Sequence, residues 1–161
     1  MSKDSLDPRG DPQNSRQIGA SDLHKLPRAE VWTKDPLDSG KEMVYSGAPF
    51  VEVLKAGGLL LDSGMARIRE IVTTTVVIDG ADGHRAVFSL AELYPDFLDG
   101  VILLADTKDR QPLPLGEGPF RLIVPSEKRR GRWVCQVKMV TVHSPDRSPR
   151  LLLLADQEYL G

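Results

Sequence analysis

The sequence is poor in the residues that build disulfides and most metal sites. Its 161 residues contain a single cysteine, Cys135, and three histidines far apart at positions 24, 84 and 143. One cysteine excludes an intramolecular disulfide and any multi-cysteine zinc or iron–sulfur site, and the histidine spacing is not that of metal ligands. Long apolar runs are also missing, so we expect no membrane span. The polar first residues do not resemble a secretory signal, which predicts a soluble protein.

An excess of one charge sign is absent as well. The 21 Lys and Arg residues and 23 Asp and Glu residues are mixed along the chain and leave a formal net charge of -2. No global field therefore favours nucleic acid or an anionic membrane as a partner, and any anion site must be local. The sequence also lacks a P-loop, a dinucleotide glycine motif, a nucleophile elbow and the spacing of a catalytic triad.

The length is that of one domain with an ordinary core. Residues 1–22 are rich in Asp, Ser, Pro, Gly and Gln, so we predict a disordered or loosely attached segment there. Residues 23–143 carry the strand and helix patterns of the folded domain. Residues 144–161 begin with a polar linker and contain four consecutive leucines at 151–154, which are an aggregation hazard if exposed. We expect this tail to pack on the domain or on a partner.

Turn residues and β-branched residues divide the domain into short strands. The clearest strand pattern is IVTTTVVI at 71–78, which is dense in β-branched residues. Alternation and turn signals predict the other strands at 29–33, 43–46, 85–88, 101–104, 120–124 and 134–142. Short helices are expected where Pro49 opens a helical pattern and where Ser89 and Glu92 have capping-box spacing. These elements predict a mixed, strand-dominated α+β domain built around a sheet.

Three segments share their pattern with one known family. Residues 101–142 read as an apolar strand, Leu-Pro, Gly-Pro-x-Arg-Leu-x-Val-Pro, a basic turn and a strand led by Trp. The other two are VYSGAPFVEVLKAGG at 44–58 and DGADGHRAVFSLAEL at 79–93. In this order they resemble the oxidoreductase molybdopterin-binding domain of the sulfite oxidase family. The resemblance spans 26–142 and implies a sulfite oxidase-type α+β fold with short peripheral helices.

Four cations in the segment at 101–142 form the candidate cofactor site. Arg121 lies on a predicted strand, and Lys128, Arg130 and Arg132 lie on the basic turn that follows. Guanidinium groups offer forked donors that match phosphate oxygens. The resemblance implies that this turn contacts a pyranopterin, so molybdopterin is the expected cofactor. The residues alone leave an alternative, in which the turn is merely a soluble surface and Arg121 forms a structural ion pair.

The one cysteine does not stand where the resemblance requires a metal ligand. The family's enzymes hold molybdenum through a cysteine upstream of the matched segment, whereas Cys135 lies downstream of Trp133 on the final predicted strand. A lone cysteine in an apolar strand is usually a small core residue, so we expect Cys135 not to bind metal. Trp133 and Phe120 are predicted to belong to the core, and the cations at 128–130 to be exposed on a loop.

Two functions are compatible with these patterns. The first is a molybdopterin-binding, oxidoreductase-like domain, degenerate in its metal ligand, that holds a pterin or another phosphorylated small molecule and meets a redox protein. The second is a non-catalytic ligand-binding or protein-interaction module on the same scaffold. Fold alone does not decide between them. The missing upstream cysteine favours the second as far as metal catalysis is concerned, whereas Arg121, Lys128 and Arg132 leave cofactor binding open. The expected location is cytoplasmic as the chain is written, or periplasmic for a processed form.

Overall fold

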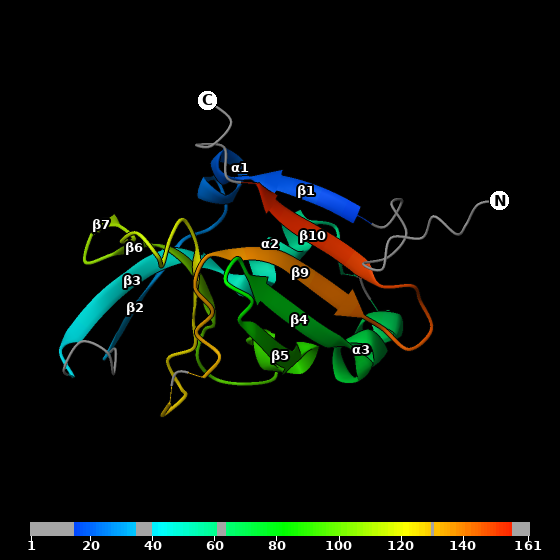
Figure 1. Ribbon diagram of the computed structural model, residues 1–161. Coiled ribbons are helices and arrows are strands. Elements are labelled where there is room, and N and C mark those ends of the chain that lie inside the picture. Colours follow the sequence, from blue (N-terminus) through cyan, green and yellow to red (C-terminus); the bar gives the residue numbers. More distant parts are fainter. Residues whose placement is uncertain (1–14, 35–39, 61–63, 130, 156–161) are drawn as a thin grey trace.

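The computed structural model describes residues 15–34, 40–60, 64–129 and 131–155 (Figure 1). In this part of the chain the fold is a strand-dominated α+β arrangement of two five-stranded sheets with a few short helices. The fold class agrees with the strand patterns of the sequence. The predicted strands are divided between two sheets instead of sharing one. No helix in these ranges is long and apolar enough to span a membrane.

The first sheet has the order β1-β10-β9-β4-β5. Neighbouring strands are antiparallel, except that β1 runs parallel to β10. Its strands are β1 (Ser15–Gly19), β4 (Thr75–Gly80), β5 (Arg85–Ser89), β9 (Val137–His143) and β10 (Arg150–Ala155).

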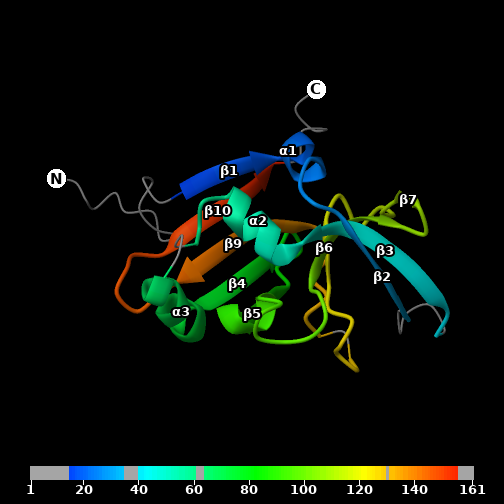
Figure 2. The same ribbon diagram turned by 180° about the vertical axis from the view of Figure 1, so that it is seen from behind.

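The second sheet has the order β2-β3-β6-β7, and β8 also pairs with β6. Its strands are β2 (Ala29–Lys34), β3 (Glu42–Pro49), β6 (Leu103–Lys108), β7 (Gln111–Pro112) and β8 (Arg121–Ile123). The helices are α1 (Ala20–His24), α2 (Phe50–Ala56), α3 (Gly64–Thr73) and the 3-10 turn η4 (Leu90–Leu93). Seen from behind, α2 crosses the face of the first sheet, and the strands β2 and β3 extend to one side (Figure 2).

Two helices form where the sequence predicts them. Pro49 caps α2, whose apolar residues Phe50, Val53 and Leu54 are buried. At η4 the amide of Ser89 donates to Oε2 of Glu92 at 2.9 Å, as a capping box requires. Local sequence signals therefore place both short helices correctly.

The strand predicted at 71–78 is wrong at its start, because residues 71–73 complete α3 and β4 begins two residues later. One tertiary interaction favours the helix over the β-branched pattern. Glu70, buried on α3, accepts from Nη2 of Arg150 on β10 at 2.5 Å. The hydroxyl of Thr73 also donates to the carbonyl of Arg69 at 2.6 Å, but such a bond to residue i−4 does not itself stabilise a helix. Tertiary pairing thus overrides local propensity.

The N-terminal segment also differs from its prediction. Residues 15–22 form β1 and the start of α1 instead of a loose segment, while residues 1–14 lie outside the described residues. The strand β1 pairs with β10 from Ser15 to Gly19, and Ile18 is buried. The leucine-rich β10 offers an open strand edge, which the composition of the N-terminus does not reveal.

The C-terminal leucines belong to the first sheet. Leu151, Leu152 and Leu154 are buried on β10, which pairs with β9. The neighbouring strand β9 begins later than predicted, at Val137, because Gln136 has a φ of 51° in the left-handed region and interrupts the extended chain. Residues 156–161 lie outside the described part.

The core lies between the two sheets and includes the predicted aromatic residues. Trp133 and Phe120 are 2% and 3% exposed, which confirms their assignment to the core. The indole Nε1 of Trp133 donates to the carbonyl of Val124 at 2.9 Å, so its one polar group is satisfied. The basic turn that precedes Trp133 is therefore anchored at its end by a buried aromatic residue.

Candidate functional site

Arg121, the first predicted cofactor residue, is inside the core. Its side chain is 1% exposed, and Nη1 donates to Glu117 Oε1 at 3.0 Å and to the hydroxyl of Tyr45 at 3.2 Å. The guanidinium carbon lies 5.3 Å from the ring centroid of Trp133 and 5.8 Å from that of Tyr45. A buried cation needs such partners, so the contacts are those of a structural ion pair supported by cation–π interactions.

Arg132, at the end of the basic turn (127–132), is held by two carboxylates. Its Nε donates to Glu127 Oε2 at 2.5 Å and its Nη2 to Glu92 Oε1 at 3.1 Å. The guanidinium carbon also lies 4.1 Å from the ring centroid of Phe88. Burial acts to lower the pKa of Arg132, but the hydrogen bonds to Glu92 and Glu127 outweigh burial and raise the pKa above its ordinary value. The charge of Arg132 is thus already neutralised within the chain.

The remaining predicted residues do not complete an anion site among the described residues. Lys128 and Arg129 are exposed on the basic turn, as predicted, and Arg130 lies outside the described residues. Cys135 is half-buried. In the described ranges no three His, Cys, Asp or Glu side chains are grouped so that they could hold a metal. Of the four predicted positions, Arg121 is enclosed in the core, Arg132 is already paired with carboxylates and Lys128 is exposed on the turn.

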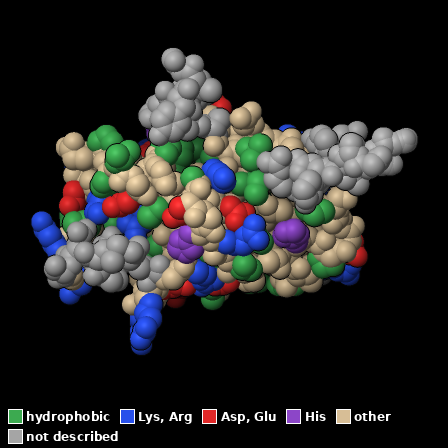
Figure 3. All heavy atoms as spheres, in the orientation of Figure 1, with side chains coloured by type: hydrophobic (Ala, Val, Ile, Leu, Met, Phe, Trp, Pro, Cys, Tyr) green, Lys and Arg blue, Asp and Glu red, His purple; other side chains and the backbone are tan. Residues whose placement is uncertain are grey.

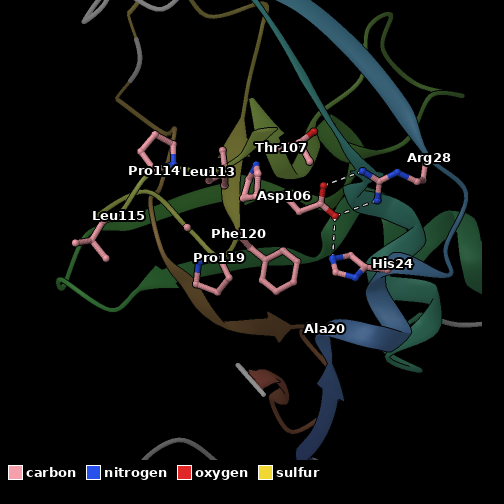
Figure 4. A pocket seen from close by; sticks show the side chains of 12 residues that line it. Ala20, His24, Arg28, Asp106, Thr107, Leu113, Pro114, Leu115, Pro119 and Phe120 are labelled. Carbon is pink, nitrogen blue, oxygen red and sulfur yellow. Dashed lines mark hydrogen bonds and ion pairs between the residues drawn. The ribbon is translucent and has the colours of Figure 1, made fainter. Parts of the chain in front are cut away.

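A different set of residues lines an open groove of about 550 Å³ between α1 and the loop at 113–120 (Figure 4). One side of this groove is apolar and is formed by Leu113, Pro114, Leu115 and Pro119, with Phe120 beneath them. Leu115 is 99% exposed, which is unusual for a large apolar side chain in an ordered turn. The groove thus combines a buried aromatic floor with a fully exposed aliphatic rim.

The other side of the groove is polar. Two of its three ionisable side chains, Arg28 and His24, both contact the third, Asp106. Arg28 donates to both carboxylate oxygens of Asp106, at 2.7 and 3.0 Å. Nε2 of His24 lies 3.2 Å from Oδ2 of the same carboxylate. The side chain of Asp106 is 11% exposed, against 55% for His24 and 40% for Arg28. The hydrogen bond to Asp106 raises the pKa of Arg28, against a smaller lowering by burial.

This polar cluster does not form a nucleophilic site with the residues around it. A general base acts on a nucleophile or substrate proton within hydrogen-bond reach. The hydroxyl of Thr107, which also lines the groove, is hydrogen bonded to the hydroxyl of Ser46 instead. Among the groove residues that the structure describes, His24 makes its polar contact with Asp106 and a ring contact with Phe120 at 6.4 Å between centroids.

The loop that forms the apolar side is fixed from below by Glu117. Its Oε1 accepts from Arg121, and its Oε2 accepts from Nζ of Lys108 at 3.3 Å. The amides of Glu117 and Gly118 both donate to the carbonyl of Pro114, at 3.0 and 3.1 Å. The amide of Gln136 donates to the carbonyl of Glu117 at 2.9 Å. Arg121 therefore supports the shape of the groove wall through Glu117, although it does not face the groove itself.

Sequence reasoning missed the polar side of the groove. His24, Arg28 and Asp106 come from α1, the segment before β2 and β6, and the hydrogen-bonded pair Arg28 and Asp106 is 78 residues apart. No local spacing links residues so far apart. The apolar side was partly visible, because Leu113, Pro114 and Pro119 belong to the matched segment at 101–142.

Comparisons with known proteins add no identification: no family model matches the chain, and no curated protein matches it. The resemblance to the sulfite oxidase family therefore stays a prediction.

Proposed function

We propose that this chain is a non-catalytic protein-interaction module on a sulfite oxidase-type scaffold, and that its groove receives an apolar segment of a partner protein. The observation that carries the proposal is the exposed Leu115 beside an open groove walled by Leu113, Pro114 and Pro119. Exposed apolar surface of this kind is a common mark of protein interfaces.

A protein segment suits the groove better than a small ligand does. Small-molecule sites aim a few unpaired polar groups at the ligand and enclose most of its surface. Here Asp106 is already shared by Arg28 and His24, and the rim is open at Leu115. Burial of apolar surface is then the main source of affinity, as it is in the centre of protein interfaces.

The molybdopterin-binding function stays a second candidate, which one observation favours. Lys128 and Arg129 are exposed on the turn that, by resemblance, contacts a pyranopterin. Against it, Arg121 is enclosed in the core and Arg132 is neutralised by Glu92 and Glu127. Two exposed cations that solvent screens provide a weak anion site.

Site-specific photo-crosslinking in cells of the source organism tests the proposal. A photo-reactive residue at position 115 should give a covalent adduct with a discrete protein. The control is the same residue at position 98, because Leu98 is also exposed, at 51%, but does not line the groove. Equal adduct patterns from the two positions, or no adduct from position 115, would contradict a docking role for the groove.

A further inference from the structure

We infer that the partner segment comes from a second copy of this chain, and that Leu115 of each copy docks in the groove of the other. This inference rests on the proposed function, because it names the occupant of the same groove. Three observations support it: the groove and a protruding side chain share one face, that side chain is held in place, and the charged side chains on the loop side, at 106–120, are engaged within the chain.

A twofold dimer requires both halves of the contact on a single surface. In such an isologous interface, residue i of one copy meets residue j of the other, and the reverse contact occurs as well. Leu115 lies at the rim of the groove, on the opposite side of the view from His24 and Arg28 (Figure 4). A partner of another kind needs only the groove, whereas a second copy uses the protruding leucine too.

The leucine is presented on an ordered turn. Pro114 precedes it, and the carbonyl of Pro114 accepts from the amides of Glu117 and Gly118. Glu117 is in turn fixed by Arg121 and Lys108. A side chain held in its bound position loses little conformational entropy on association, so its burial contributes more of its full value.

The charges beside the groove are already engaged. Between Asp106 and Phe120 each charged side chain has a partner within the chain. The contacts are Asp106 with Arg28, Lys108 with Glu117, Asp109 with the amide of Val44, Arg110 with Glu30 and Glu117 with Arg121.

Paired charges have a consequence for partner choice. Two identical faces that each carried free charges of one sign would repel, and this cost is absent here. A strongly acidic or basic partner would gain little from a face whose charges are satisfied. The loop side of the groove, at 106–120, is therefore electrostatically compatible with a second copy of itself.

The molecular face drawn in Figure 3 also shows basic, acidic and apolar side chains interspersed.

Sedimentation velocity of the full chain tests the inference directly. Over a range from about 1 μM to about 1 mM, which spans moderate to weak affinities, the protein should pass from monomer to dimer. Leu115→Asp should weaken the dimer by about 100-fold or more, because the buried leucine is lost twice in a twofold interface. Leu98→Asp, a charge placed at an exposed leucine away from the groove, should leave the association constant unchanged.

A crosslink between copies supplies the second readout. A photo-reactive residue at position 115, in an equal mixture of ¹⁴N- and ¹⁵N-labelled protein, should give mixed-isotope peptides that join position 115 to 20–28 or to 106–120. Circular dichroism of Leu115→Asp should be unchanged, since the native side chain is 99% exposed and makes no core contact.

The possible failures are separable. A protein that sediments as a monomer throughout, or a dimer that Leu115→Asp does not weaken, overturns the second-copy inference. If position 115 nevertheless captures a different protein in cells, the proposed function stands. If position 115 captures nothing and the chain is monomeric, both fail.

Discussion

The basic turn and the groove both contain arginine–carboxylate pairs, but they differ in what surrounds those pairs. On the basic turn Arg132 is clamped between Glu92 and Glu127, and the neighbouring Lys128 and Arg129 extend into solvent. In the groove the pair of Arg28 and Asp106 borders an apolar wall. Exposed cations such as Lys128 and Arg129 give weak binding on their own, whereas the apolar wall beside the Arg28 pair is available to a partner.

A cluster of cations in the sequence therefore does not by itself form an anion site in the fold. The availability of each cation depends on the carboxylates that approach it from distant segments. Glu92 lies 40 residues from Arg132 and neutralises it in the fold. Charge counting along the turn therefore overstates its capacity for phosphate.

The largest expected effect concerns Trp133, which follows the basic turn and also contacts Arg121, the residue that supports the groove wall. Trp133→Ala should destabilise the domain by roughly 3 to 5 kcal/mol, because Trp133 is buried and ends the basic turn while it also contacts Arg121. Urea denaturation measures the difference in the free energy of unfolding. An unchanged transition midpoint would remove Trp133 from the core.

The second prediction separates Arg121 from the exposed cations. Arg121→Ala should cost about 3 kcal/mol, because it leaves Glu117 without its buried partner and loosens the groove wall. Lys128→Ala, at an exposed position on the basic turn, should stay within about 0.5 kcal/mol of the parent. Equal effects of the two substitutions in thermal or urea unfolding would contradict the structural role of Arg121.

A third prediction compares two arginines of the basic turn. Arg132→Ala should destabilise by about 1 to 2 kcal/mol, since it removes hydrogen bonds to Glu92 and Glu127 at a partly exposed site. Arg129→Ala should have no measurable effect, because Arg129 is exposed. Differential scanning calorimetry of the pair checks this. A larger effect for Arg129→Ala than for Arg132→Ala would contradict the structural role of Arg132.

The smallest effect is expected in the groove. Arg28→Ala should cost under about 1 kcal/mol, because the Arg28 side chain is 40% exposed and solvent screens its pairing with Asp106. Because the pKa of Arg28 is raised in the fold, its contribution is fully present at neutral pH and is lost only as the pH rises through that raised pKa, far above neutrality. The difference between parent and variant should therefore be constant across neutral pH in urea denaturation. A difference that changes steeply near neutrality would assign the coupling to another group.

Local signals predicted much of the fold. The capping box at Ser89, the proline at the start of α2 and the buried Trp133 all depend on short-range patterns. The start of β4 was mispredicted, because the pairing of Glu70 with Arg150 favours a helix that no local pattern reveals. The strand β1 was missed for a similar reason, since its partner β10 lies at the other end of the chain.

The candidate site was less predictable than the fold. The sequence places its cations close together, but it does not show that Glu117 encloses Arg121 or that Asp106 joins His24 to Arg28. These contacts depend on how the two sheets and α1 meet. Apolar loop residues such as Leu113 and Pro119 were recognised as part of a motif, but not as a surface.

The central claim is that the groove, and not the basic turn, is the binding surface. The most direct measurement places the same photo-reactive residue at position 115 or at position 128 and compares the adducts formed by the folded, full-length protein in cells. Both positions are exposed, so accessibility does not bias the comparison. The account predicts a discrete protein adduct from position 115 and none from position 128. An adduct from position 128 alone would contradict it.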